Sequence, residues 1–212
     1  MSDTAPPPEA FDPRWMAAAG IRVLDHGLPE LPAVLTRQMA VPMAFWTTAN
    51  CAVVLFLRYP DRTEDWDEDW DQAMGTTATF SRQPDGWAAD RWWTGSGWRD
   101  PIAEPDMSRH LGGRAIVYSG GSFTDRPSPG QLAAVEVGLV SPAVAAIALT
   151  QEGNEDRREL RSHFGAWVVC TEKWAPYRID ALDETGAVIG SIAGPPKLPA
   201  RPSTRDAGPG SH

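Results

Sequence analysis

Residues Cys51 to Tyr59 read CAVVLFLRY, and this stretch has the strongest strand character in the chain. It is apolar without a break until Arg58, so both faces of a strand formed by it would be covered. A strand that is covered on both faces needs neighbours on either side. We therefore predict that Cys51–Tyr59 is a central strand of a β-rich protein.

The sequence after this strand predicts a β-hairpin. Thr76–Arg82 alternates small polar and apolar residues, and Trp87–Trp93 returns after the sequence Gln83-Pro84-Asp85-Gly86. Proline presets φ for the first corner of a turn, and glycine accepts a positive φ. Two strand-like runs joined by such a turn indicate a hairpin.

Six further strand-like runs follow the proline-containing bridge around Pro101 and Pro105. Their spacing of roughly ten to fifteen residues favours a sandwich or meander over βαβ units. The segments GLVSPAVAAIALT, HFGAWVVCTE and IDALDETGAVIG resemble those of β-rich proteins from GC-rich bacteria, a resemblance that implies no activity. We predict a mainly β fold with a few short α-helices and sandwich-like or meander antiparallel sheets. The six runs are Arg114–Ser119, Leu132–Val140, Val144–Gln151, His163–Thr171, Tyr177–Asp183 and Ala187–Ala193.

Two short helices are predicted ahead of these strands. Asp12 suits the N-cap of a helix, Pro13 its first position and Gly20 the position after its end, so residues 12–20 predict one helix. Leu31–Met39 is the second candidate helix.

Aperiodic, proline-rich ends set the predicted domain limits. Residues 1–12 and residues 194–212 have the composition of disordered tails. Between them we expect an N-terminal β-rich module with short helices at residues 13–107. A C-terminal β-sandwich-like module is expected at residues 114–193.

The most acidic stretch is TEDWDEDWDQAMG, residues Thr63–Gly75. Counted from Asp65, an EF-hand loop needs glycine at its sixth position and glutamate at its twelfth, where this chain has Trp70 and Thr76. A mobile acidic loop and a weak cation site are alternatives to a helix. A helix explains the pattern better, because it gathers four apolar side chains on one stripe, namely Trp66, Trp70, Ala73 and Met74.

Composition argues against several classes of function. The formal net charge is −9 and no basic patch is visible, which disfavours a nucleic-acid surface. Cys51 and Cys170 are isolated, so we expect two reduced thiols in a cytoplasmic protein, with a single disulfide between them as the alternative. The uncharged run Met39–Leu57 is interrupted by Pro42 and polar residues and does not predict a membrane span. The N-terminus shows no export signal, and we expect no bound cofactor or metal.

Tryptophans cluster around the predicted hairpin and its continuation. In WWTGSGWRD, residues 92–100, aromatic faces stand beside polar side chains, a combination common in sugar and ligand sites. The simpler interpretation places Trp87 and either Trp92 or Trp93 in the core, with Trp98 covering a sheet edge, because neighbours in a strand point to opposite faces. The candidate ligand-binding residues are Trp92, Trp93, Trp98, Arg99 and Asp100.

No catalytic arrangement is evident in the sequence, and we assign no catalytic residue. His163 and Cys170 lie seven residues apart on one predicted strand, which places them on opposite faces, and His110 lacks metal-ligand spacing. The segment Ser119-Gly120-Gly121-Ser122 favours a plain turn over an anion-binding nest. The charged run Glu155–Arg161 favours a solvated loop or a sheet edge.

These observations favour a non-catalytic interaction or structural protein with a protein partner. The alternative is a small-molecule or carbohydrate-binding protein that holds a ring-bearing ligand on an exposed tryptophan platform. A hydrolase-type enzyme with a site assembled from distant segments is the second alternative, because catalytic triads are spatial rather than sequential.

Overall fold

The computed structural model describes residues 13–31, 33, 40–58, 73–98, 107–124, 127 and 131–194. In these ranges the chain forms eleven strands in three antiparallel sheets, one α-helix and one short 3₁₀ helix. The predicted mainly β fold of antiparallel sheets is confirmed. No helix in the same ranges is both long and apolar enough to cross a membrane.

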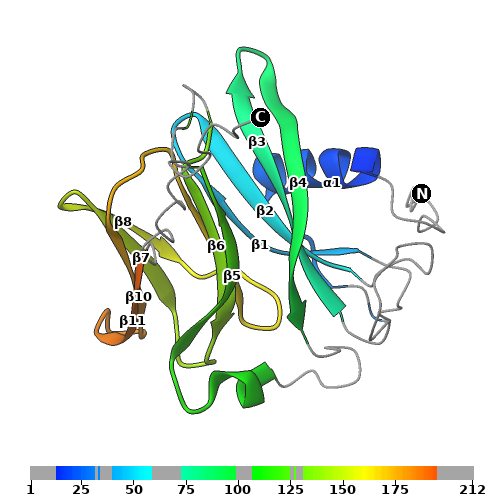
Figure 1. Ribbon diagram of the computed structural model, residues 1–212. Helices are drawn as coiled ribbons and strands as arrows, with labels where there is room; N and C mark the ends of the chain where they lie inside the picture. The colour runs from blue at the N-terminus through cyan, green and yellow to red at the C-terminus, as the bar shows by residue number, and fades with distance from the viewer. Residues whose placement is uncertain are drawn as a thin grey trace, which may run out of the picture.

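The sheets are stacked in layers, with the helix outside the first of them (Figure 1). Sheet A has the order β1-β2-β3-β4, sheet B the order β5-β6-β9, and sheet C the order β11-β10-β7-β8. Sheet B lies between sheets A and C, and sheet A lies between sheet B and α1. The elements are α1 (Pro13–His26), β1 (Val41–Thr47), β2 (Cys51–Arg58), β3 (Ala73–Gln83), β4 (Gly86–Trp98), η1 (Met107–Leu111), β5 (Ile116–Phe123), β6 (Ala134–Val140), β7 (Ala146–Gln151), β8 (Asn154–Glu159), β9 (Ala166–Thr171), β10 (Tyr177–Leu182) and β11 (Val188–Gly194).

Strand β2 is central, as its apolar run predicts. It pairs with β1 on one side and β3 on the other, and every residue of it is buried. Val54 and Phe56 pack toward α1, whereas Val53 and Leu55 join the core shared with sheet B. An unbroken apolar run suits this position because both faces of the strand are covered.

Sheet B is also covered on both faces, and β6 and β9 are buried throughout. At Gly138 an added Cβ would lie 2.7 Å from Trp167 Nε1 and 2.0 Å from the Val117 carbonyl oxygen, so glycine makes room for the indole. Strands β5 to β11 form two facing antiparallel sheets of three and four strands, which is a sandwich arrangement. That architecture serves many unrelated functions and indicates none. One continuous core cluster contains side chains of all three sheets.

The first predicted helix is confirmed, but its predicted end at Gly20 is wrong. Helix α1 runs from Pro13 to His26 and is followed by Gly27, whose φ is +85°. A Cβ at Gly20 would lie 2.2 Å from Cζ of Phe80. Gly20 therefore allows the helix to pack closely on sheet A, and Gly27 provides the left-handed residue that ends it.

The predicted acidic helix is wrong at its C-terminal end. Ala73, Met74 and Gly75 belong to β3, where Gly75 pairs with Leu57 and Ser96. The rest of Thr63–Gly75 lies outside the described residues. The same is true of the predicted helix 31–39 apart from Leu31 and Ala33, and of residues 1–12 and 195–212.

The β3–β4 hairpin is confirmed, with Gln83 paired to Gly86 across the turn. The sequence did not indicate β1, whose ladder carries a register shift beside Pro42. Strand β8 forms the edge of sheet C, as the charged run suggested. The predicted plain turn at residues 119–122 is wrong, because this segment lies in β5 with a bulge, and a Cβ at Gly121 would be 2.5 Å from the Val135 carbonyl oxygen.

Candidate ligand-binding groove

A groove lies where sheets A and B diverge, between the β3–β4 hairpin and strands β5 and β6. We call it the hairpin groove, and its volume is about 520 Å³. Ligand pockets in proteins commonly have volumes of about 300–1,000 Å³, so the groove is large enough for a small molecule. The polar side chains that line it are Thr79, Asp90, Arg91, Ser122, Thr124 and Gln131.

A β-bulge on strand β4 shapes one wall of the groove. Thr79 pairs with Arg91 and Phe80 with Ala89, which leaves Asp90 as the extra residue. A bulge bends its strand and redirects side chains, and bulges are common beside functional sites. The Asp90 carboxylate accepts a hydrogen bond of 3.0 Å from Ser81 Oγ, and Thr79 Oγ1 donates one of 3.2 Å to the Arg91 carbonyl oxygen.

Arg91 brings an available positive charge to this wall. Its side chain is exposed, and no carboxylate or carbonyl group of the described residues pairs with its guanidinium. Arg82, nearer the hairpin tip, lies 4.8 Å from the centre of the Trp87 ring. The Arg91 guanidinium can therefore receive an anionic group without first breaking an ion pair.

The opposite wall combines an aromatic ring with hydroxyl groups. Phe123 packs edge-on against Trp174, with 5.9 Å between ring centroids. The backbone N–H of Thr124 donates a 2.8 Å hydrogen bond to the Ala133 carbonyl oxygen. The backbone N–H of Ala133 donates a 2.7 Å hydrogen bond to the Thr171 carbonyl oxygen. This wall is thus tied to the sheets, while its Ser122 and Thr124 hydroxyls border the groove.

The predicted tryptophan site adjoins the groove along β4. The backbones of Trp92, Trp93 and Trp98 pair with β3, and Trp92 directly follows Arg91. The side chains of these three tryptophans lie outside the described residues, as do Arg99 and Asp100. The platform therefore stays a prediction. Trp87, which the simpler interpretation placed in the core, is half-buried beside the cluster under α1.

A second hollow, the junction crevice, lies where β1, the β7–β8 hairpin and the end of β9 meet, and its volume is about 410 Å³. Arg158 of β8 crosses it to β1. Its Nη1 donates to Thr47 Oγ1 at 2.8 Å, its Nη2 to the Thr47 carbonyl oxygen at 2.6 Å, and both Nε and Nη2 bond to the Asp156 carboxylate. The guanidinium also lies 4.4 Å from the centre of the Trp46 ring.

Glu172 holds the β1–β2 turn from the other side of the crevice. Its carboxylate accepts hydrogen bonds from the Asn50 backbone N–H at 2.9 Å, from Asn50 Nδ2 at 2.8 Å and from Thr48 Oγ1. Burial alone would raise the pKa of Glu172, but these hydrogen bonds together outweigh it and leave the pKa below its ordinary value. The polar groups of the crevice mostly bind one another.

Both cysteines are buried free thiols close to this junction. Burial, followed by the nearby Glu172 and Asp90 carboxylates, raises the pKa of Cys51 to about 11. Burial also raises the pKa of Cys170, with a further contribution from Cys51. Because the thiolate is the nucleophile, neither cysteine is activated for catalysis at neutral pH.

The histidines do not form a catalytic pair in the part of the chain that the structure describes. His163 Nε2 lies 2.8 Å from the Pro29 carbonyl oxygen, and no carboxylate or cysteine of the described residues hydrogen-bonds to His110 or His163. No three His, Cys, Asp or Glu side chains of the described residues are grouped to hold a metal ion. The hydrolase alternative has no supporting geometry in these ranges.

Comparison with protein-family models, curated proteins and solved structures gave no match. The chemistry of the two hollows is therefore the basis for a functional proposal. The junction crevice uses its charged groups to hold strands together. The hairpin groove is bordered by the Arg91 guanidinium, the Asp90 carboxylate that accepts from Ser81, the hydroxyl groups of Ser122 and Thr124, and the Phe123 ring.

Proposed function

We propose that the protein binds a small polar molecule with an anionic group in the hairpin groove. The observation that carries this proposal is the Arg91 guanidinium, which borders the groove and has no pairing partner among the described residues. A guanidinium presents a planar fork of donors that matches a carboxylate or phosphate.

The other groove residues support the same ligand class. Ser122 and Thr124 offer hydroxyls that both donate and accept hydrogen bonds, and Phe123 and Leu132 offer apolar contact. Walls that belong to sheets hold such groups in place without ordering a loop on binding. The predicted platform of Trp92 and Trp93 follows Arg91 along β4, so a ring-bearing acid fits the proposal as well.

The proposal is tested by replacing the cation in the groove. Wild-type protein is screened by native mass spectrometry and calorimetry against carboxylated sugars, sugar phosphates and aromatic acids. We expect Arg91→Ala to weaken binding of the best ligand by about tenfold or more, the usual effect of losing a hydrogen bond to a charged group. The midpoint of thermal unfolding stays unchanged, because Arg91 makes no pair that stabilises the described fold.

Arg161→Ala is the matched control, since it also removes one exposed arginine but lies at the end of β8. It should bind the ligand as wild type does. Binding that survives Arg91→Ala, or that falls equally in both variants, would contradict the assignment of the groove.

A further inference from the structure

A carboxyl group is buried between sheets B and C. Glu136 lies in the middle of β6 and is 1% exposed. Its register neighbours are Gly121 on β5 and Val169 on β9, neither of which has a charge. Buried carboxylates in proteins normally have a cationic partner or several hydrogen-bond donors.

The carboxyl group of Glu136 is bonded on one side only. Its Oε1 accepts a hydrogen bond from the Tyr177 hydroxyl of β10, which joins sheet B to sheet C. Its Oε2 is buried and has no hydrogen-bond partner in the described part of the chain. The hydrogen bond from Tyr177 to Glu136 therefore joins the two sheets, and it leaves the second carboxyl oxygen of Glu136 without a described partner.

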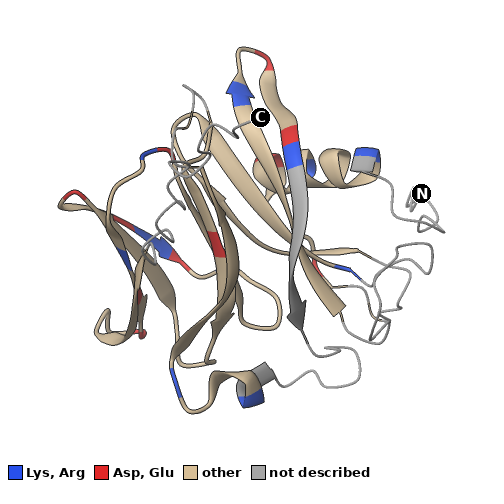
Figure 2. Ribbon diagram, in the orientation of Figure 1, with Lys and Arg blue, Asp and Glu red and all other residues tan. Residues whose placement is uncertain are grey.

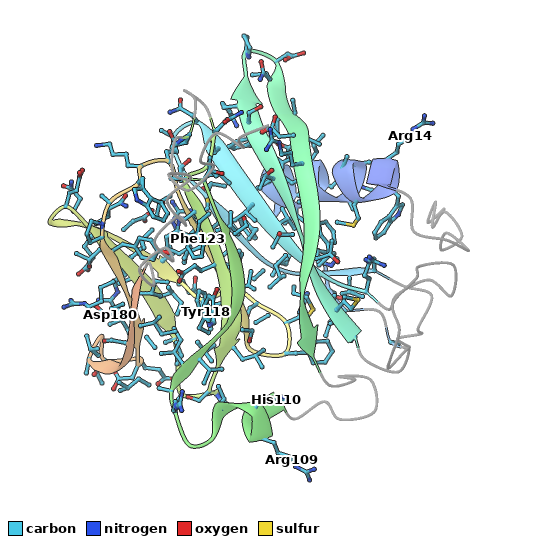
Figure 3. All side chains as sticks on the ribbon, viewed as in Figure 1. Arg14, Arg109, His110, Tyr118, Phe123 and Asp180 are labelled. Carbon is cyan, nitrogen blue, oxygen red and sulfur yellow. The ribbon has the colours of Figure 1, made fainter. Side chains whose placement is uncertain are left out.

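Glycines on β11 and β5 make room for a cluster formed by Glu136, Tyr177 and Tyr118. A Cβ at Gly194 of β11 would lie 2.5 Å from Cε2 of Tyr177, and one at Gly121 of β5 would lie 3.3 Å from the Tyr118 hydroxyl oxygen. Tyr118 is 44% exposed and lies on the side of β5 that faces sheet C (Figure 3). The cluster thus reaches from the core to a residue in contact with solvent.

Among the residues that the structure describes, no cation balances a negative charge at this position. The titratable groups that act on Glu136 from the neighbouring strands are Tyr118 of β5 and Tyr177 of β10. Burial raises the pKa of Glu136, against the opposite effect of the Tyr177 hydrogen bond. Burial and Glu136 raise the pKa values of both tyrosines. Each of these shifts favours the neutral form of its group relative to the same group in water.

Asp180, a buried carboxylate of sheet C, has the hydrogen-bond and ion-pair partners that Glu136 lacks. It is 2% exposed, like Glu136, but it accepts hydrogen bonds from Arg178 Nε at 2.8 Å and from Ser191 Oγ at 2.5 Å. The arginine supplies the positive charge that Glu136 lacks. The two buried acids thus differ in their partners rather than in their burial.

We propose that Glu136 carries a proton in the folded protein and forms, with Tyr177, a proton-dependent joint between sheets B and C. The proton resides on Oε2, because Oε1 accepts from Tyr177. As the pH rises through the raised pKa of Glu136, the proton passes to solvent, and the uncompensated carboxylate weakens the contact between β6 and the β10–β11 pair. Sheet C then separates more readily from the rest of the core.

Infrared spectroscopy of the wild-type protein tests the proton directly. At neutral pH we expect the carbonyl stretching band of a protonated carboxyl group, shifted in deuterium oxide and absent from Glu136→Gln. Asp180→Asn is the matched control and keeps the band, because Asp180 is paired as a carboxylate. A wild-type spectrum without this band at neutral pH overturns the proposal, whether or not the variants fold.

The pH dependence of unfolding gives a second test. A glutamate whose folded pKa is raised contributes stability below its ordinary pKa and loses it as pH rises through the folded value. Relative to Glu136→Gln, the wild type should lose up to about tenfold in folding equilibrium constant per pH unit within that window. If the stability of the wild type and of Glu136→Gln changed in parallel with pH, the proposed proton-dependent joint would be contradicted.

Tyr177→Phe separates a joint from ordinary packing. This variant lacks the hydroxyl that donates to Glu136 and favours its carboxylate form. The pKa of Glu136 should therefore rise, and the pH range over which stability is lost should move upward. A purely structural role for Tyr177 would lower stability equally at every pH and leave the window in place.

Discussion

The two edges of sheet A differ in how far their polar groups are used. At the β1 edge, backbone carbonyl oxygens accept from Arg158 of β8 and from the backbone N–H of His163 ahead of β9. At the β4 edge, the hairpin groove is open and Arg91 has no described partner. Figure 2 shows charged residues at the hairpin tip and along β8, with few in the layers between them.

Arg91 and Arg158 present the same chemical group in opposite situations. Arg158 contacts Asp156, Thr47 and the Trp46 ring, so it holds the edges of sheets A and C together. Arg91 makes no comparable contact with the described residues and borders the hairpin groove. Donors that are paired with acceptors of the same protein stabilise its structure, whereas donors left unpaired beside a hollow are a common basis of ligand recognition.

At the β1 edge of sheet A, the largest expected effect is on the reactivity of Cys51. The pKa of Cys51 is raised from 9.0 to about 11, so at mildly alkaline pH its thiolate fraction falls about a hundredfold on folding. A colorimetric aromatic disulfide reagent should modify the folded protein at least that much more slowly than the protein in guanidinium. Similar rates in both states would show that the junction is open to the reagent.

The next effect compares two arginines of the same region. Arg158→Ala removes charge-assisted hydrogen bonds to β1 and should lower the free energy of unfolding by about 2 kcal/mol. Arg161→Ala removes an ion pair with Glu159 whose side chains are 72% and 73% exposed, and it should change stability by less than about 0.5 kcal/mol. Urea unfolding measures both, and equal losses would contradict a specific junction.

The smallest effect concerns the carboxylate that holds the β1–β2 turn. Glu172→Gln keeps the shape but loses charge-assisted acceptors, and at neutral pH it should cost about 1 kcal/mol. Because the folded pKa of Glu172 is lowered, its contribution is present above the ordinary glutamate pKa and lost as pH falls through the folded value. The gap between wild type and variant in urea unfolding should therefore close in acid, and a gap that persists would exclude ionisation as its cause.

The elements that sequence patterns predicted are those with local signals. The apolar run at Cys51–Arg58, the turn at Gln83–Gly86 and the helix start at Pro13 are each readable within a few residues, and each is present in the structure. Strand β1 was missed because Pro42 interrupts its pattern and a bulge accommodates it. The sequence does not reveal the role of Gly20, because glycine is needed there to make room for the Phe80 ring, which is distant in the chain.

The candidate site was less accessible to sequence reasoning. The tryptophan pattern points to β4, but no sequence pattern marks the groove residues Asp90 and Arg91, and Ser122 stands out only as part of a predicted turn. The bulge that leaves Asp90 unpaired depends on the register of β3 against β4. No spacing within one strand reports how it is aligned with another.

By itself the sequence determined that this chain forms antiparallel sheets with a strongly buried strand at Cys51–Arg58, because hydrophobic patterning and turn chemistry act over short distances. Only the tertiary structure decided that Arg158 is bound while Arg91 has no partner among the described residues, and that Glu136 meets Tyr177 without a cation from that part of the chain. Those outcomes depend on which strands become neighbours, and burial or pairing of a polar group is a property of its neighbours rather than of its position in the chain.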